Sequence, residues 1–350
     1  MRTLILAAGR FGDPLPREIA ESREPRLDVF ELRDALGADL MDFRDVDAST
    51  RPAVRAARRS VGASAALALV GAEAASRYDA VLTTGEDIGI PLAALLLGSR
   101  RAPAHTMIAH TLTPWKKRLA FHLLRVQRRI DRFVCYASSE ERNLVERLGI
   151  PAAKIRRIYF HADARFFQQN GAAPEPDLIC SAGQLLRDYD SLIEAVEGLP
   201  VRVRIAAGSP WISHSLEPRK QLPSNVDWRR YNRDELRLLY ARSTVAVVPI
   251  LENDYQTGIS TILEMMSMGK CVIATRTQGQ TDTIVDGVTG IYVPPGDPAA
   301  LRRAIIRVLE HPEESARIGG AARRFIEQEA SLEIFVSRIS QVVRESVQVR

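Results

Sequence analysis

Short apolar runs alternate with longer amphipathic stretches along the whole chain. The apolar runs predict strands at residues 3–8, 40–43, 80–84, 106–110 and 133–137 in the first half, and at 178–182, 201–206, 226–228, 245–249, 271–274 and 291–293 in the second. The amphipathic stretches predict helices at residues 52–77, 189–197, 233–242, 259–267, 298–310, 312–329 and 332–345. Because parallel strands need helical crossovers, this order is typical of an α/β protein whose parallel sheets are covered by helices on both faces.

A polar, proline-rich segment interrupts the alternation at residues 168–177. The chain of 350 residues is long for a single hydrophobic core and suits two. We therefore expect two doubly wound, Rossmann-like lobes, at residues 1–168 and 178–330, joined by a linker at 169–177. Lobes of this kind bind ligands at the carboxyl ends of their strands, so a central cleft is expected between them.

The composition excludes several classes of protein. Hydrophobic residues make up 46% and charged residues 26%, the ordinary balance of a globular chain, so a disordered protein is excluded. No apolar run approaches the roughly 20 residues of a membrane span, and residues 4–8 indicate a first strand rather than a signal peptide. Cys135, Cys180 and Cys271 are too widely spaced for a disulfide framework or a zinc site. We expect a cytoplasmic protein without a metal.

The net charge of +5 is concentrated in one segment. Residues 100–132 carry nine basic and one acidic side chain, a net +8, whereas the rest of the chain has a net charge of −3. Apolar residues recur there at helical spacing: Trp115, Leu119, Leu123, Val126, Ile130 and Phe133. Residues 113–132 therefore predict a basic amphipathic helix.

Two interpretations of this helix stay open. It packs on the core with its basic faces in solvent, or it lies on an anionic membrane surface and makes the protein peripheral at the inner face of the membrane. Nucleic acid is not an expected partner, because aromatic residues are only 6% of the chain and no recognition motif accompanies the charge.

The clearest chemical signal is a polar loop, residues 252–258, between a predicted strand and a predicted helix. Backbone N–H groups at a helix start are unsatisfied, so this is a ready site for an anion such as a phosphate. Gly258 would let a phosphate approach the backbone, and Ser260 and Thr261 add hydroxyl donors. Glu264, about one turn inside the helix, can accept hydrogen bonds from a vicinal diol such as a ribose. An ordinary strand–loop–helix connection with an N-cap is the alternative.

Several motifs give the chain a family resemblance. Residues 263–274 (LEMMSMGKCVIA) and 286–297 (DGVTGIYVPPGD) resemble the donor half of the family 4, or group 1, glycosyltransferases of the GT-B fold. Shorter matches follow at residues 138–140, 149–151, 158–167, 181–183, 187–189 and 192–195. The resemblance covers residues 130–330 and is nearly absent before residue 80.

This resemblance implies the GT-B fold, in which two Rossmann-like lobes face a cleft. It implies transfer of a sugar from a nucleotide diphosphate sugar to an acceptor that the sequence does not identify. It further implies retention of the anomeric configuration, no metal and no cofactor, and a C-terminal helix within residues 331–350 that returns to the first lobe.

The resemblance also implies roles on the donor side. Glu264 corresponds to the second acid of the family's Glu-x7-Glu pattern, which holds the nucleotide ribose. Arg187 stands where a basic residue neutralises the diphosphate, a task that suits a fixed guanidinium, and Lys270 is a further candidate. The remaining donor-side candidates are the backbone donors Gly258, Ile259 and Ser260, the neighbouring Thr261, Gly183 at the opening of the lobe, and Gln184, which occupies the family's other basic position.

The chain departs from the family at the first acid of this pattern. Eight residues before Glu264 it has Gln256 instead of Glu, and the loop spacing also differs. Asp254 or Glu252 can supply the missing carboxylate, while Gln256 can still donate a hydrogen bond to a sugar hydroxyl. We therefore expect an active enzyme with altered donor contacts. The alternatives are a sugar-nucleotide epimerase of the same fold and a non-catalytic relative that binds nucleotide sugars.

Candidates in the first lobe follow its predicted strands. His110 ends a strand where the family often places a His near the acceptor, and it can hold a hydroxyl or carry its proton. Glu86 and Asp87 follow another strand and are acceptor-side candidates. A structural role for His110 and a helix cap by Asp87 are the alternatives. The loop after the first strand weakly resembles the family's acceptor-facing glycine loop, at Arg10, Phe11 and Gly12. It is not Gly-x-Gly-x-x-Gly, which argues against a nicotinamide or flavin enzyme.

Overall fold

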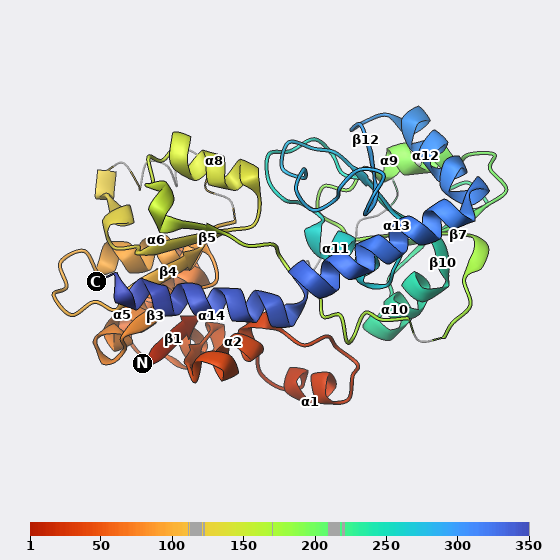
Figure 1. Ribbon diagram of the computed structural model, residues 1–350. Helices are drawn as coiled ribbons and strands as arrows, with labels where there is room; N and C mark the ends of the chain where they lie inside the picture. The colour runs from red at the N-terminus through yellow and green to blue at the C-terminus, as the bar shows by residue number, and fades with distance from the viewer. Residues whose placement is uncertain are drawn as a thin grey trace. The chain divides into compact units, whose positions relative to one another are not determined.

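The computed structural model describes residues 1–110, 112, 121, 123–169, 171–208, 218 and 221–349 (Figure 1). The chain forms two compact units. Unit 1 comprises Met1–Ala20, Arg26–Ile158 and Phe335–Arg350, and unit 2 comprises Glu21–Pro25 and Tyr159–Ile334. The main change from unit 1 to unit 2 thus follows Ile158, ahead of the linker expected at residues 169–177. The last residues of that expected linker belong to a strand, β7 (Glu175–Ala182).

Unit 1 is built on a parallel sheet with the strand order β2-β1-β3-β4-β5-β6. Its strands are β1 (Thr3–Leu6), β2 (Asp39–Met41), β3 (Ala80–Thr83), β4 (Ala104–Ile108), β5 (Arg132–Cys135) and β6 (Ile155–Arg157). Every residue of β1, β3, β4 and β5 is buried, as expected for strands covered on both faces. The first five strands were expected from the apolar runs. The sequence does not predict β6, because this short strand carries two arginines, Arg156 and Arg157.

The helices of unit 1 are α1 (Leu15–Ala20), α2 (Asp28–Leu36), α3 (Phe43–Ala48), α4 (Pro52–Ser60), α5 (Ala63–Ala74), α6 (Glu86–Leu95), α8 (Ser138–Glu146) and most of α14 (Leu332–Gln348). Short 3-10 turns are η1 (Ala75–Arg77), η2 (Val126–Arg128) and η3 (Ala152–Lys154). The single helix expected over residues 52–77 is divided into α4, α5 and η1. Gly62 separates α4 from α5 with a φ of 120°, a conformation that glycine adopts without strain.

Unit 2 is built on a second parallel sheet, with the strand order β12-β11-β10-β7-β8-β9. After β7 come β8 (Arg202–Ala206), β9 (Val226–Arg229), β10 (Ser243–Val248), β11 (Val272–Thr275) and β12 (Ile291–Val293). The helices are α9 (Tyr189–Val196), α10 (Arg233–Arg242), α11 (Ile259–Ser267), α12 (Pro298–Glu310) and α13 (Pro312–Phe325), and a π-helical turn, η4 (Ile326–Ala330), follows α13.

Buried apolar side chains cover both faces of this second sheet. Alternate residues of β7 contribute to two different clusters, Leu178 and Cys180 to one and Ile179 to the other. The structure confirms the prediction of an α/β protein with two Rossmann-like lobes, and the strands and helices of the second half lie where the sequence predicts them.

The basic segment differs from the single helix expected at residues 113–132. Residues 113–120 and 122 of that prediction lie outside the described residues. Further on, Arg125 has a φ of 51° and is followed by the 3-10 turn η2, and Phe133 lies in β5. Leu123 is 71% exposed instead of facing the core. The expected apolar stripe is therefore not one helix, and contact with an anionic membrane stays a prediction.

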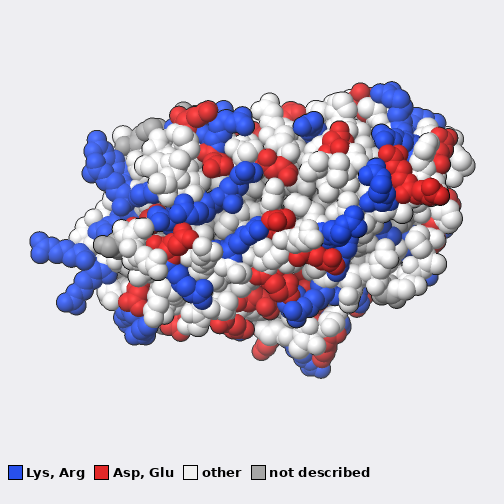
Figure 2. Space-filling model, viewed as in Figure 1, with Lys and Arg blue, Asp and Glu red and all other residues white. Residues whose placement is uncertain are grey.

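The charge on one face of the molecule and the hydropathy of its helices bear on a membrane contact. Lys and Arg side chains are interspersed with Asp and Glu over the face drawn in Figure 2. Within the part of the chain that the structure describes, no helix has both the length and the apolar character needed to cross a membrane.

Candidate functional site

The carboxyl ends of β7 and β10 form the topological switch point of unit 2. These strands are neighbours, but the chain continues from β7 to β8 on one side and from β10 to β11 on the other. Backbone hydrogen bonds join the loops that leave them, from Leu251 N to Leu186 O at 2.9 Å and from Asp188 N to Pro249 O at 3.1 Å. Open α/β sheets bind ligands at such a point. The two loops and the helices that follow them therefore form the candidate site.

Arg187 is the buried cation of this site, with 9% of its surface exposed. Its Nε donates to Ala182 O at 2.9 Å, one terminal nitrogen donates to Leu185 O at 2.9 Å, and the other donates to Thr261 Oγ1 at 3.2 Å. All three acceptors are neutral, and Arg187 makes no ion pair with any described residue. Burial lowers the pKa of the Arg187 guanidinium. Because a guanidinium has five N–H donors, two remain for a ligand, and a buried cation with neutral partners favours an anion.

Two glycines make room for this side chain. Gly183, after β7, has a φ of 100°, and Gly258, before α11, has a φ of 80°. A Cβ atom on Gly183 would collide with the Arg187 guanidinium, and one on Gly258 would lie 3.1 Å from both Arg187 Nη1 and Ile250 Cδ1. Any other residue would be strained at these positions. The guanidinium therefore lies against bare backbone, with both glycines at the site where the sequence predicts them.

The first turn of α11 lies beside Arg187. Its N-cap residue is Gly258, which provides no side-chain cap, so the first N–H groups of the helix are available at the carboxyl end of β10. Ile259 is half-buried, Ser260 is exposed, and Thr261 is buried and accepts the hydrogen bond from Arg187. The helix dipole adds partial positive charge at this end. Arg187 and this turn together make the switch point electropositive.

Glu264 lies further along α11 and contacts helix α10. It accepts a hydrogen bond from Tyr240 Oη at 3.3 Å, and Arg233 Nη1 lies 3.7 Å from its carboxylate. Arg233 also pairs with Glu24 at 3.1 Å. Burial raises the pKa of the Glu264 carboxyl, and Arg233, Tyr240 and Arg187 partly offset that effect.

Sequence reasoning missed the partners of Glu264, because neither Arg233 nor Tyr240 belongs to a recognised motif. Their spacing of two helical turns places both on one face of α10, and this periodicity is the signal that points to them. Tyr189 belongs to the match at residues 187–189 without a predicted role, and its buried hydroxyl donates to Gly183 O at 2.6 Å.

The polar loop before α11 uses its side chains to hold neighbouring loops. Gln256 is buried, and its Nε2 donates to Thr283 Oγ1 at 3.3 Å. One of the two N–H donors of this amide is thereby engaged, so donation by the other to a sugar hydroxyl stays a prediction, and Oε1, without a partner among the described residues, is left as an acceptor. Glu252 accepts from Gln278 N at 3.0 Å. Asp254 is half-buried in this loop, and Gln184 is buried after β7.

Comparison with known proteins decides the family of unit 2. Residues 178–311, which contain Arg187, Gly258 and Glu264, match the family model described as glycosyl transferases group 1. Unit 2 carries a group 1 glycosyltransferase domain. The resemblance found in the motifs is thereby confirmed, and so is the prediction that the chain is a glycosyltransferase.

Two named relatives and one solved structure illustrate how far the similarity extends. Alpha-D-kanosaminyltransferase of Streptomyces kanamyceticus is 23% identical over 310 residues, which are 82% of this chain and 78% of that protein. An uncharacterized glycosyltransferase of Methanocaldococcus jannaschii is 28% identical over 80 residues, 22% of this chain and 20% of that protein. HepE from Anabaena, solved in complex with UDP and also with UDP-glucose, has a TM-score of 0.71 at 16% identity, covering 99% of this chain and 100% of that one. At this identity the likeness shows the GT-B fold.

Lys270 of the glycosyltransferase domain does not belong to the site. It precedes β11, at the amino-terminal edge of the sheet, whereas Arg187 and the start of α11 lie at the carboxyl edge. Its buried Nζ donates to Ala241 O at 2.7 Å and to Ser243 O at 2.8 Å. The expectation that Lys270 meets the diphosphate is therefore wrong, because its buried ammonium group is held by two backbone carbonyls where α10 is followed by β10.

Lys270→Met is expected to lower the free energy of unfolding and to leave nucleotide binding unchanged. The substitution leaves two buried carbonyl groups without their donor, a loss of about 1–3 kcal/mol. Chemical denaturation measures the first effect and isothermal titration calorimetry with UDP the second. If the folded variant has a higher Kd for UDP than the wild type, Lys270 does contribute to the donor site.

In unit 1 of the glycosyltransferase, His110 and Glu86 lie together after β4 and β3. The backbone N of His110 donates to Glu86 Oε2 at 2.9 Å, and the ring Nε2 lies 2.9 Å from Thr84 O. Because a carbonyl only accepts, Nε2 carries a proton and Nδ1 is the acceptor in the neutral ring. His110 is exposed and Glu86 is buried. Asp87 is exposed in the first turn of α6, where the helix dipole stabilises a carboxylate.

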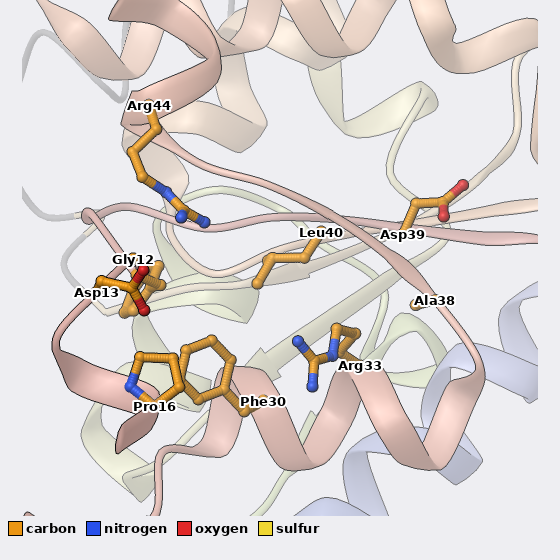
Figure 3. A pocket seen from close by; sticks show the side chains of 10 residues that line it. Gly12, Asp13, Pro16, Phe30, Arg33, Ala38, Asp39, Leu40 and Arg44 are labelled. Carbon is orange, nitrogen blue, oxygen red and sulfur yellow. The ribbon is translucent and has the colours of Figure 1, made fainter. Parts of the chain in front are cut away.

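The other acceptor-side candidates lie elsewhere in unit 1. Arg10 pairs with Asp47 through Nε at 3.1 Å and a terminal nitrogen at 3.0 Å. Phe11 and Gly12 line a pocket of about 410 Å³ beside β2, which includes neither His110 nor Glu86 (Figure 3). The structure therefore separates the candidates into two groups. Within the described ranges, no three His, Cys, Asp or Glu side chains are grouped to hold a metal ion.

Proposed function

We propose that this glycosyltransferase takes its sugar from a nucleoside diphosphate sugar held by unit 2 at the carboxyl ends of β7 and β10. The observation that carries the proposal is Arg187, a buried cation that hydrogen-bonds only neutral acceptors and lies beside the uncapped start of α11. A diphosphate supplies the negative charge that such a site lacks. The UDP-bound structures of HepE, which shares the fold, support the choice of ligand class.

In this proposal the site stabilises the leaving group. As the bond between the anomeric carbon and the diphosphate breaks, negative charge grows on the phosphate oxygens. The two remaining N–H donors of Arg187 and the first N–H groups of α11 meet that charge from fixed positions, so little reorganisation accompanies the reaction. These groups supply the positive charge that a bound cation would otherwise provide, so we propose a metal-independent transfer. Retention of the anomeric configuration is proposed from the family match alone.

The remaining donor contacts follow from the chemistry of the neighbouring side chains. The Glu264 carboxylate accepts from the ribose hydroxyls, and Arg233 and Tyr240 fix its position. Gln256 Oε1 accepts from a sugar hydroxyl, and Asp254 is the nearby carboxylate of the same loop. On the acceptor side, His110 Nδ1 is available to accept the proton of an attacking hydroxyl.

Calorimetric titration with UDP, ADP and GDP, followed by nucleotide-release assays with the corresponding sugar nucleotides, tests this function. We expect saturable binding of at least one nucleotide, release that an acceptor accelerates, and an anomeric proton in the product with the configuration of the donor. Binding without release would indicate a non-catalytic relative, and sugar interconversion without transfer an epimerase. If none of the nucleotides binds, the proposed donor site is wrong.

A further inference from the structure

We propose that the pocket beside β2 in unit 1 binds a small polyhydroxylated ligand that carries one anionic group, a carboxylate or a phosphate. Its volume of about 410 Å³ lies in the range of small-molecule sites. Two guanidinium groups, two carboxylates and several apolar side chains line this volume (Figure 3). The geometry of the pocket alone supports ligand binding. That this ligand is the glycosyl acceptor rests on the proposed function.

Arg44 is fixed in place on one side of the pocket. Its Nε lies 3.1 Å and 2.9 Å from the two carboxylate oxygens of Asp42, and one terminal nitrogen lies 2.9 Å from Asp42 as well. Asp42 is fully buried and also accepts from Phe11 N at 3.0 Å, so the pair is part of the pocket wall. A Cβ atom on Gly12 would lie 2.6 Å from Arg44 Nη1, which shows how closely the guanidinium covers this glycine. Its other terminal nitrogen is left to a ligand.

Arg33 faces the same volume from α2. Its Nε donates to Asp34 Oδ1 at 2.7 Å, and its guanidinium carbon lies 5.3 Å from the centre of the Phe30 ring. Solvent screens the Arg33–Asp34 pair, because 67% of the Asp34 side chain is exposed. The positive charge of Arg33 is therefore available to a bound anion. Carboxylates and phosphates accept paired hydrogen bonds from a planar guanidinium, which makes either one the expected group.

The rest of the pocket suits the polyol part of the ligand. Leu40 and Phe30 provide apolar surface for the C–H face of a sugar-like ring. The Asp13 carboxylate lies across the pocket from Arg33 and can accept hydrogen bonds from hydroxyl groups (Figure 3). Because Asp13 would repel a second anion, the single negative charge of the ligand belongs at the arginine side. Asp39 plays no such part, since its side chain accepts from Tyr78 Oη at 2.7 Å.

Calorimetric titration of the full chain with glucose 6-phosphate, glucuronate, glucose and inorganic phosphate tests the proposal. We expect one or both charged sugars to bind about tenfold or more tightly than glucose, and the difference to shrink at high salt. Comparison of glucose 6-phosphate with glucuronate distinguishes phosphate from carboxylate. Arg33→Gln should abolish the preference, whereas Arg142→Gln, at an exposed arginine of α8, should keep it.

Gly12→Val gives a second test that removes no charge. The added side chain displaces the Arg44 guanidinium, so the charged sugars should bind more weakly while the thermal midpoint reports whether the variant folds. Equal affinity for glucose and both charged sugars, or an unchanged preference in folded Arg33→Gln, would overturn the proposal. If inorganic phosphate binds as tightly as glucose 6-phosphate, the proposal that the pocket recognises a polyhydroxylated ligand is wrong. UDP titration of the same samples reports on unit 2 separately, so failure of the donor site is distinguishable from failure of this pocket.

Discussion

Arg187→Met is expected to lower kcat/KM for nucleotide release by about a hundred- to a thousandfold, because it removes the positive charge that faces the departing diphosphate. The fold should survive the change. The substitution removes three hydrogen bonds to neutral acceptors, but it also removes a buried charge that forms no direct ion pair with any described residue. These two effects oppose each other, so we expect only a small change in the thermal midpoint. UDP should no longer raise that midpoint.

Arg302→Met is the matched control for this prediction. Arg302 also caps backbone carbonyls in unit 2, donating to Ala195 O at 3.0 Å and to Glu197 O at 2.7 Å, but it lies on α12. The control should lose stability without loss of nucleotide binding. Steady-state kinetics and thermal scans with and without UDP measure both variants. If Arg187→Met keeps most of the activity, or if both variants lose it equally, Arg187 does not serve the leaving group.

The sequence predicts the fold of the second half well because local signals there agree with one another. Helices α10, α11 and α12 begin and end where periodicity and capping place them, and Asn232 and Asp297 cap two of these helices as N-cap residues. The first half carries weaker signals. The short helix α1 buries none of its residues, so no apolar period marks it. Strand β6 combines one buried isoleucine with two arginines and lacks the alternation that predicts a strand.

The site could be predicted only as far as backbone position determines it. Gly183, Arg187 and Gly258 meet because strand order brings the ends of β7 and β10 together, and motif positions along the chain are enough to expect that. The direction of a long side chain is decided by packing instead. Lys270 donates to the carbonyls of Ala241 and Ser243, and Gln256 donates to Thr283. These partners come from segments that are distant in sequence. No local pattern contains that information.

Glu264→Ala is expected to weaken UDP binding by about ten- to a hundredfold, since a buried carboxylate that accepts from ribose hydroxyls makes charge-assisted hydrogen bonds. Glu264→Gln keeps the shape and one acceptor, so its loss should be smaller. Glu194→Ala, at an exposed position of α9, is the control and should bind UDP as the wild type does. Calorimetry measures the three affinities. An unchanged Kd in folded Glu264→Ala would show that the ribose is held elsewhere.

The pH dependence separates an ionised Glu264 from a neutral one. Burial raises the pKa of this carboxyl above its value in the unfolded chain, so the native state keeps the proton to higher pH than the unfolded state does. Stability contributed by Glu264 therefore falls as pH rises from the unfolded pKa to the native one, and it levels off above that. UDP affinity should rise as the pH approaches the native pKa from below, because the ionised carboxylate is the better acceptor for ribose hydroxyls. Glu264→Gln should reduce the pH dependence of both the stability and the UDP affinity. If this variant keeps the wild-type pH dependence of UDP binding, another group causes that dependence.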